Sequence, residues 1–193
     1  MILLIDNYDS FSYNLVQLIG GLCKENGGEE IKVIRNDELT VKEIEDLHPS
    51  RIILSPGPGR PCDAGVCEDV VKQLKGKVKI LGVCLGHQGI CESFGATVTY
   101  AKQLMHGKQS EASLDTSVDI FKGLPQKVMV ARYHSLAADK STLPAELKVI
   151  AQTEDGEVMA VKHTEYEIYG LQFHPESVLT PDGATMMKNF LFE

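Results

Sequence analysis

The residue best suited to chemistry is Cys84, which stands between glycines in the segment Gly82–Gly86. A short apolar run, Ile80–Val83, precedes it, and a helical pattern, Gln88–Phe94, follows it. Small neighbours allow a nucleophile to sit on a sharp strand-to-helix turn, with its side chain exposed at the top of a sheet. The helix amino terminus would stabilise a thiolate, and the amide of Leu85 could donate to an oxyanion. The pattern predicts a cysteine nucleophile on a strained turn.

Two other roles compete for Cys84. Free cysteine is usually a small, buried core residue. Cys84, His87 and Cys91 are also spaced so that they could share one helical face and hold a metal ion. We expect no metal, because the turn places Cys84 before the helix and no fourth ligand is evident. Cys91 is then expected to pack in the core.

The base for this nucleophile is predicted to be His174, one of six histidines. It follows the strand expected at Ile168–Phe173, so it would also lie at the carboxyl end of a strand. Glu176 stands two residues further along, and residues two apart in an extended chain point the same way. Glu176 is therefore expected to hydrogen-bond the imidazole and set its tautomer. Alone, a His beside a Glu would usually be a solvated surface pair, but together with Cys84 it completes a catalytic set.

The third element is the alternating Pro and Gly run Ser55–Gly59, directly after the strand expected at Arg51–Leu54. Such a run stiffens the backbone and lets an amide approach a ligand closely, which suits a second oxyanion donor at Gly57. A rigid turn without a chemical role is the competing interpretation.

The elements that must position these residues alternate between short apolar runs and helical patterns in the first half of the chain. This alternation predicts an open, mostly parallel, doubly wound α/β sheet with helices on both faces and ligands beyond the carboxyl ends of the strands. After residue 96, shorter runs predict a smaller antiparallel or mixed portion. Residues 1–193 are expected to form a single domain. The expected strands are Met1–Ile5, Ile31–Ile34, Arg51–Leu54, Ile80–Val83, Thr97–Ala101, Val128–Arg132, Leu147–Gln152, Val158–His163 and Ile168–Phe173, and the expected helices are Phe11–Leu22, Val41–Leu47, Val66–Leu74, Gln88–Phe94 and Gly183–Phe192.

Composition argues against several classes of protein. A net charge of -8 and the lack of a basic patch disfavour nucleic-acid binding. No stretch approaches the roughly 20 apolar residues of a membrane span. The start, Met1–Asp6, lacks the features of a signal peptide, and five cysteines make a disulfide framework improbable. We expect a cytoplasmic protein with reduced thiols.

Taken together, these segments resemble the class I, or triad, glutamine amidotransferases, over the chain from Met1 to Phe192. Within that family the combination is similar to the glutaminase subunits of anthranilate synthase (component II) and of aminodeoxychorismate synthase. The motifs that carry the resemblance are Asp6–Phe11, Ser55–Gly59, Gly82–Gln88, Tyr133–Leu136 and Phe173–Ser177.

The resemblance implies that Cys84 attacks the side-chain amide of L-glutamine, while His174 transfers protons and Glu176 orients His174. A glutamyl thioester and ammonia would result, and water would release glutamate. The amides of Gly57 and Leu85 would hold the oxyanion in both steps.

The resemblance also implies a set of substrate-binding residues. From sequence alone, Gln88 could equally be a polar helix residue and Ser135 a loop residue. No cofactor is expected in this chain. The family positions that hold glutamine are matched by Gly57, Pro58, Gly59, the side chain of Gln88, and the backbone of Ser135 and Leu136.

The resemblance finally implies a partner, a chorismate-binding synthase subunit of the component I type that receives ammonia through a channel. The segments Asn7–Phe11 and Gln103–Ser110 resemble regions near the partner surface, although the first could be an ordinary loop in which Ser10 caps the next helix. The tryptophan pathway is favoured over the folate pathway, and one subunit can serve both. A free-standing cysteine amidase and an inactive regulatory module are the remaining alternatives.

Overall fold

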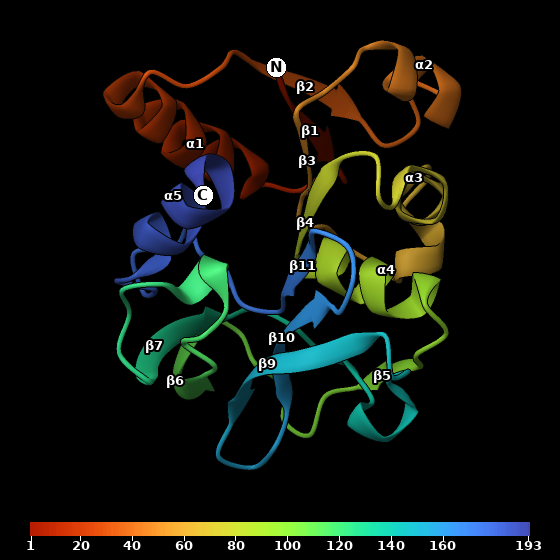
Figure 1. The fold of residues 1–193 in the computed structure, drawn as a ribbon. Coiled ribbons are helices and arrows are strands. Elements are labelled where there is room, and N and C mark those ends of the chain that lie inside the picture. Colours follow the sequence, from red (N-terminus) through yellow and green to blue (C-terminus); the bar gives the residue numbers. More distant parts are fainter.

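A nine-stranded sheet runs through the computed structural model, which describes residues 1–193 (Figure 1). Neighbours among the first five strands in the order below are parallel, and the remaining strands continue the same sheet in antiparallel fashion. In sheet order the strands are β2 (Ile31–Arg35), β1 (Ile2–Asp6), β3 (Arg51–Leu54), β4 (Lys79–Val83), β11 (Ile168–Leu171), β10 (Val158–His163), β9 (Leu147–Thr153), β6 (Lys108–Leu114) and β7 (Lys127–Arg132). A separate antiparallel pair joins β5 (Val98–Tyr100) to β8 (Leu136–Ala138). The predicted α/β sheet with an antiparallel portion is confirmed.

Helices cover both faces of the parallel part (Figure 1). On one face lie α1 (Ser12–Asn26) and α5 (Gly183–Phe192), and on the other lie α2 (Val41–Asp46), α3 (Cys67–Leu74) and α4 (Leu85–Ser93). Short 3-10 helices cover Pro61–Asp63, Asp119–Phe121 and Lys140–Thr142. No helix is long and apolar enough to cross a membrane.

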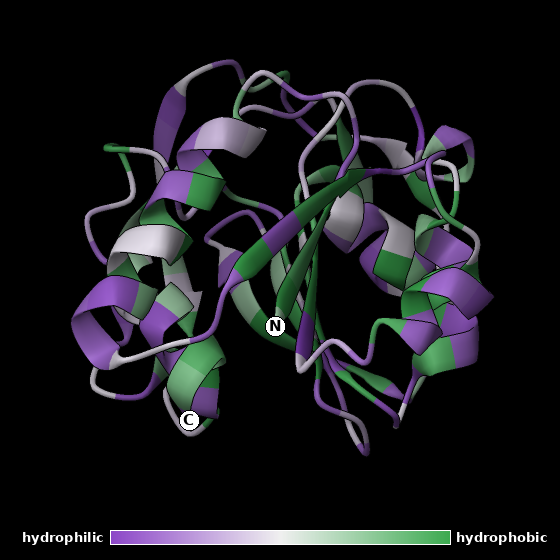
Figure 2. Cartoon of the chain, turned by 90° about the horizontal axis from the view of Figure 1, so that it is seen from above, coloured by the Kyte–Doolittle hydropathy of each residue, from purple (hydrophilic) through white to green (hydrophobic).

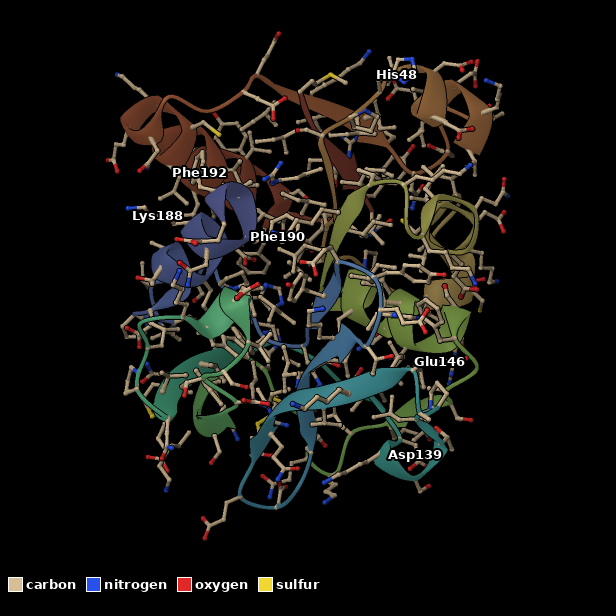
Figure 3. The ribbon with its side chains drawn as sticks, in the orientation of Figure 1. His48, Asp139, Glu146, Lys188, Phe190 and Phe192 are labelled. Carbon is tan, nitrogen blue, oxygen red and sulfur yellow. The ribbon has the colours of Figure 1, made fainter.

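The central parallel strands are buried on both sides, which explains why they are nearly continuous apolar runs, whereas the edge strand β2 is largely exposed. Leu4 packs in the core under α1 and α5, whereas Leu3 and Ile5 pack in the core under α2, α3 and α4. Successive side chains of a strand point to opposite faces, so a central strand needs apolar residues at every position. Figure 2 shows these mostly hydrophobic strands between helices of mixed character. On α5, Phe190 lies toward the sheet and Lys188 toward solvent (Figure 3).

Most boundaries agree with the predictions, and the differences have local causes. The helix α4 begins at Leu85 and not at the expected Gln88, and the pattern missed its first turn because Gly86 and Gly89 weaken the helical signal there. The strands β6 and β8 were not predicted, since β6 buries only Ala112 and Leu114 and β8 has three residues.

The loop before α1 is held by aspartates, and the alternative in which Ser10 caps the helix finds no support in the structure. The N-cap is Phe11, which makes no side-chain cap. Asp9 Oδ2 instead accepts from the Phe11 amide at 2.8 Å, and Asp6 Oδ1 accepts from the Ser12 hydroxyl at 2.7 Å. The two carboxylates, and not Ser10, therefore make the side-chain hydrogen bonds that shape this loop.

Candidate active site

Cys84 occupies the turn between β4 and α4, and its backbone is left-handed, with φ 53° and ψ −102°. Such a conformation costs about 1–3 kcal/mol for a residue with a side chain, so the surrounding structure must hold it. The Cys84 amide donates to the carbonyl of Leu171 in β11 at 2.7 Å, and the Cys84 carbonyl accepts from the Gln88 amide at 3.0 Å. The turn is thus tied to a neighbouring strand and to the helix that it starts.

The two glycines beside Cys84 are required by close packing. A Cβ at Gly82 would lie 2.3 Å from the backbone of Gly86, and a Cβ at Gly86 would lie 2.4 Å from the carbonyl oxygen of Leu54. Real Cβ atoms do not approach this closely. The helix α4 therefore starts directly against the ends of β3 and β4, with Cys84 at its amino terminus.

His174 and Glu176 form a buried pair, with 2.6 Å between Nδ1 and Oε1. The prediction that they contact holds, but the extended conformation expected for them is wrong. The strand β11 ends at Leu171, and His174 begins a turn in which the Ser177 amide donates to the His174 carbonyl at 3.3 Å. Thr180 also donates its hydroxyl to that carbonyl, at 2.7 Å. Bonds from later residues thus bend the chain and hold Glu176 against the ring.

The charge of His174 follows from its neighbours. Burial lowers its pKa, but the Cys84 sulfur and the Glu176 carboxylate outweigh burial and raise the pKa to about 10. With Nδ1–H donated to Glu176, Nε2 is the nitrogen that remains for proton exchange, and it makes no hydrogen bond to a protein group. The arrangement favours an imidazolium beside the sulfur.

Two aromatic rings that sequence reasoning did not single out enclose this imidazole. The ring centroids of Phe11 and Tyr133 lie 5.7 Å and 5.0 Å from that of His174, both edge-on. They exclude water from the ring, which strengthens the interactions of His174 with its charged partners. Both rings lie in motifs that carry the resemblance, but their contact with His174 was not predictable because the three residues are far apart in the chain.

A cavity of about 180 Å³ opens beside Cys84. Its wall includes every residue that was predicted to hold substrate. It is lined by Gly57, Pro58, Gly59, Cys84, Gln88, Tyr133, His134, Ser135 and Leu136. His174 and Glu176 line a second cavity of about 510 Å³, together with Phe11, Asn14, Gln17, Leu18, Tyr133, Ser177 and Val178. Tyr133 borders both cavities.

Gly57 packs against the side chain of Leu85, the residue that carries the other predicted oxyanion donor. A Cβ at Gly57 would lie 2.9 Å from Leu85 Cδ2. Neither amide donates to an acceptor within the protein. The first amides of a helix have no intrahelical partner, and Leu85 is the first residue of α4. Both N–H groups are therefore free to bind a ligand atom.

The Gln88 side chain belongs to a chain of hydrogen bonds at the cavity. Its amide donates to the Leu136 carbonyl at 2.9 Å and to Gln172 Oε1 at 3.2 Å, and Gln172 in turn donates to Cys84 Sγ at 3.7 Å. Sequence reasoning missed Gln172. The available signal was a polar residue that interrupts an apolar stretch, between Leu171 and Phe173.

The loop that carries Ser135 and Leu136 is anchored by a buried ion pair. Arg132 pairs with Glu157, and its Nε donates to His134 Nε2 at 3.1 Å. His134 Nδ1 then donates to the Leu136 carbonyl at 2.7 Å. Burial and the charge of Arg132 lower the pKa of His134 to about 4, so this histidine is a neutral structural link.

The metal alternative for Cys84 gains no support from the geometry. No group of three or more His, Cys, Asp or Glu side chains is placed to hold a metal ion. His87 is fully buried, which lowers its pKa to about 3, and its Nε2 lies 3.9 Å from Cys91 Sγ. Cys91 packs in the core under α3 and α4, as expected.

Comparison with known proteins identifies the family. The model of the family "Glutamine amidotransferase class-I" matches residues 3–193. The aminodeoxychorismate/anthranilate synthase component 2 of Bacillus subtilis is 49% identical, over 99% of this chain and 95% of its own length. The anthranilate synthase component 2 of Pseudomonas aeruginosa is 49% identical, over 99% and 94%. Against two longer relatives with several functions, the chain spans only 32% and 24% of their length.

A solved structure supports the same family. A Thermoplasma acidophilum protein, provisionally assigned to the GMP synthases, superimposes with a TM-score of 0.85 at 27% identity, over 98% of this chain and 91% of that one. Its fold is the α/β arrangement described above. By sequence and by fold, this chain belongs to the class I glutamine amidotransferases.

Proposed function

We propose that this chain hydrolyses L-glutamine and supplies the ammonia to a chorismate-binding synthase subunit, as component 2 of an anthranilate synthase in tryptophan biosynthesis. The observation that carries the proposal is that Cys84 lies on its strained turn beside the Gly57 turn, and that its sulfur interacts with His174, which is paired with the buried Glu176 side chain. Relatives of nearly the same length named anthranilate synthase component 2 support the assignment.

In the first step the Cys84 thiolate attacks the side-chain amide carbon of glutamine. A carbon–sulfur bond forms while the carbonyl electron pair moves to oxygen, and the amides of Gly57 and Leu85 hold that oxyanion. When the tetrahedral intermediate collapses, His174 Nε2 gives its proton to the leaving nitrogen, and ammonia departs. Glu176 keeps the ring oriented throughout. The product is a glutamyl thioester on Cys84.

In the second step water releases glutamate. His174, now neutral, takes a proton from the water as its oxygen attacks the thioester carbon. The oxyanion forms again at the same two amides, and the carbon–sulfur bond breaks to restore the thiolate and the imidazolium. Removing one oxyanion donor typically lowers kcat by about 10²–10³-fold, so these amides would supply a large part of the rate.

Substrate selection is assigned to the wall of the smaller cavity. Gln88 and the backbone of Ser135 and Leu136 present donors and acceptors there, beside the backbone of Pro58 and Gly59. Few but well-placed polar groups are typical of small-molecule sites, where they set the orientation of the ligand. We therefore assign these residues to binding of the glutamine backbone and side chain.

We propose that the partner binds at the mouth of the larger cavity, beside His174. Val178 on its rim is 93% exposed, and Leu104 in the predicted partner segment is 72% exposed. We propose that contact with the synthase subunit covers both of these apolar side chains. The cytoplasmic location and the absence of a cofactor stay predictions from the sequence.

A second candidate is the glutaminase subunit of aminodeoxychorismate synthase, because the Bacillus subtilis relative carries both names. The test is glutamate release by the purified chain, alone and with each type of synthase subunit, with Cys84→Ser as the control. Stimulation by an anthranilate synthase subunit, lost in Cys84→Ser, is the expected result. Stimulation by the aminodeoxychorismate subunit would favour the second candidate. Full activity without a partner would indicate an independent amidase, and the lack of Cys84-dependent hydrolysis with any partner would refute the proposal.

A further inference from the structure

Asn7, just beyond β1, is buried and has a role that the partner-surface prediction for Asn7–Phe11 did not foresee. Only 3% of Asn7 is exposed, and Ser55, its main contact, is fully buried. Its side chain is therefore unavailable to another subunit. It points instead at the turn that leads to Gly57.

The backbone amide and the side-chain amide of Asn7 both donate hydrogen bonds to Ser55. The Asn7 backbone amide donates to Ser55 Oγ at 2.8 Å, and its side-chain Nδ2 donates to the Ser55 carbonyl at 2.8 Å. Ser55 Oγ donates its own proton to the Pro56 carbonyl at 2.7 Å. Asn7 thus holds Ser55 directly through its side chain and its backbone amide, and Ser55 in turn holds the carbonyl of Pro56.

The other end of the Asn7 amide is fixed as firmly. Its Oδ1 accepts from Asn36 Nδ2 at 3.0 Å and from the Cys67 thiol at 3.1 Å. Burial raises the pKa of Cys67 to about 12, so this thiol stays neutral and keeps its proton to donate. A rotation that exchanged Oδ1 and Nδ2 would turn favourable contacts into donor–donor and acceptor–acceptor pairs. The amide therefore has one orientation.

Asn7 also contacts Gly57 directly. A Cβ at Gly57 would lie 2.6 Å from Asn7 Cβ and 2.7 Å from the Asn7 carbonyl oxygen. Leu85 Cδ2 would lie 2.9 Å from the same Cβ. Gly57 is therefore packed closely against both Asn7 and Leu85, the residue that carries the other free amide.

We propose that Asn7 is a positioning residue that holds the Gly57 amide where the oxyanion forms, by anchoring the Ser55–Gly57 turn. The inference rests on the proposed glutamine hydrolysis and deepens it. Asn7 touches neither substrate nor sulfur and acts through the turn. Oxyanion donors are effective only when they are held in place before charge develops, so a looser turn should slow acyl transfer more than it weakens substrate binding.

The chain offers a matched control for a merely structural role. Asn189 is also buried, and its Nδ2 also holds a loop through carbonyls, those of Ile120 at 3.2 Å and Lys122 at 2.9 Å. It lies on α5, outside both cavities. Asn189→Ala should lower the melting temperature much as Asn7→Ala does, and should leave catalysis unchanged.

The test compares two reactions of Cys84 in the full chain with its synthase subunit. Glutamine hydrolysis builds an oxyanion, whereas alkylation by iodoacetamide displaces iodide at a saturated carbon and builds none. For Asn7→Ala we expect kcat to fall about 10- to 100-fold, less than for outright loss of a donor, with KM within about threefold. The rate of Cys84 alkylation should stay within about twofold of the wild-type rate, because the reactivity of the thiolate does not depend on the Ser55–Gly57 turn.

Asn7→Leu serves as a second variant, because it keeps nearly the size and shape of the side chain and removes both of its hydrogen-bonding atoms without adding a charge. It should show the same split between hydrolysis and alkylation, and it carries the test if Asn7→Ala does not fold. Unchanged kcat in folded Asn7 variants, or an equal fall in hydrolysis and alkylation, would overturn the inference. Failure of the proposed function is distinguishable, because the wild type would then release no glutamate, and the inference would fall with it.

Discussion

Removing the negative charge of Glu176 should shift the pH dependence of glutamine hydrolysis. In Glu176→Gln the 2.6 Å contact to His174 Nδ1 becomes a hydrogen bond from the imidazole to a neutral side-chain amide. The site is buried, with 1% of the Glu176 side chain exposed, so water cannot replace the lost charge. His174 keeps its other partner, Cys84.

The size of the shift follows from hydrogen-bond energies. A bond to a charged group contributes about 1.5–3 kcal/mol and a neutral one about 0.5–1.5 kcal/mol, so the variant loses about 1–1.5 kcal/mol of stabilisation of the imidazolium. Since about 1.4 kcal/mol corresponds to one pKa unit, the pKa of His174 should fall by about one unit from about 10. The imidazolium of His174 loses its proton as the pH rises through this raised pKa. The variant therefore loses the proton donor at lower pH.

The assay is the pH dependence of kcat/KM for glutamate release, measured for both proteins with the same synthase subunit. The alkaline limb should move about one unit toward acid in Glu176→Gln, and kcat should fall at least about tenfold, because the ring also loses its preferred tautomer. Ionisation of glutamine itself affects both proteins equally. Glu111→Gln, which removes an exposed carboxylate paired with Lys127, should leave the profile unchanged. Identical alkaline limbs and kcat values within about twofold would refute the assignment of His174 as the proton donor.

Three further predictions concern stability. Gly86→Ala should abolish glutamate release and lower the melting temperature, because its Cβ would lie 2.4 Å from a backbone oxygen at the end of β3; an active, equally stable variant would contradict the turn geometry. Arg132→Met should cost about 3–5 kcal/mol in urea unfolding, because it leaves Glu157 buried without its partner. A loss below about 1 kcal/mol would mean that water reaches Glu157. Burial and Glu68 raise the pKa of Glu92 to about 6, so its protonated form favours the fold below the ordinary value of 4.5 and this contribution is lost as pH rises through about 6. Glu92→Gln should therefore raise the melting temperature above about pH 6 and leave it nearly unchanged below about pH 4, and the same gain at both pH values would contradict the reasoning.

Local motifs explain how much of the site could be predicted. The segment Gly82–Gly86 carries its own geometry, because each glycine removes a clash that the turn creates. His174 and Glu176 are two residues apart, so their contact was predictable, although the turn that makes it was not. The short spacing indicated which two side chains meet, but it did not indicate the backbone turn that brings them together.

Contacts between distant segments were not predictable. Gln172 reaches Cys84 and Asn7 reaches Ser55 only because β11, β4, β3 and β1 are neighbours in the sheet. A polar residue at a strand end shows no partner in the sequence. Asn7 was accordingly assigned to a surface, whereas burial and the bonds to Ser55 make it part of the interior.

The sequence by itself determined the alternation of strands and helices, the strained turn at Cys84 and the pairing of His174 with Glu176, because each depends on residues that are close together in the chain. Only the tertiary structure decided that the carboxyl ends of β3, β4 and β11 lie side by side, with one cavity beside Cys84 and another beside His174. Strand order depends on how buried faces pack over the whole sheet, and β4 pairs with β11 although the strands β5 to β10 lie between them in the chain. No local pattern encodes that choice.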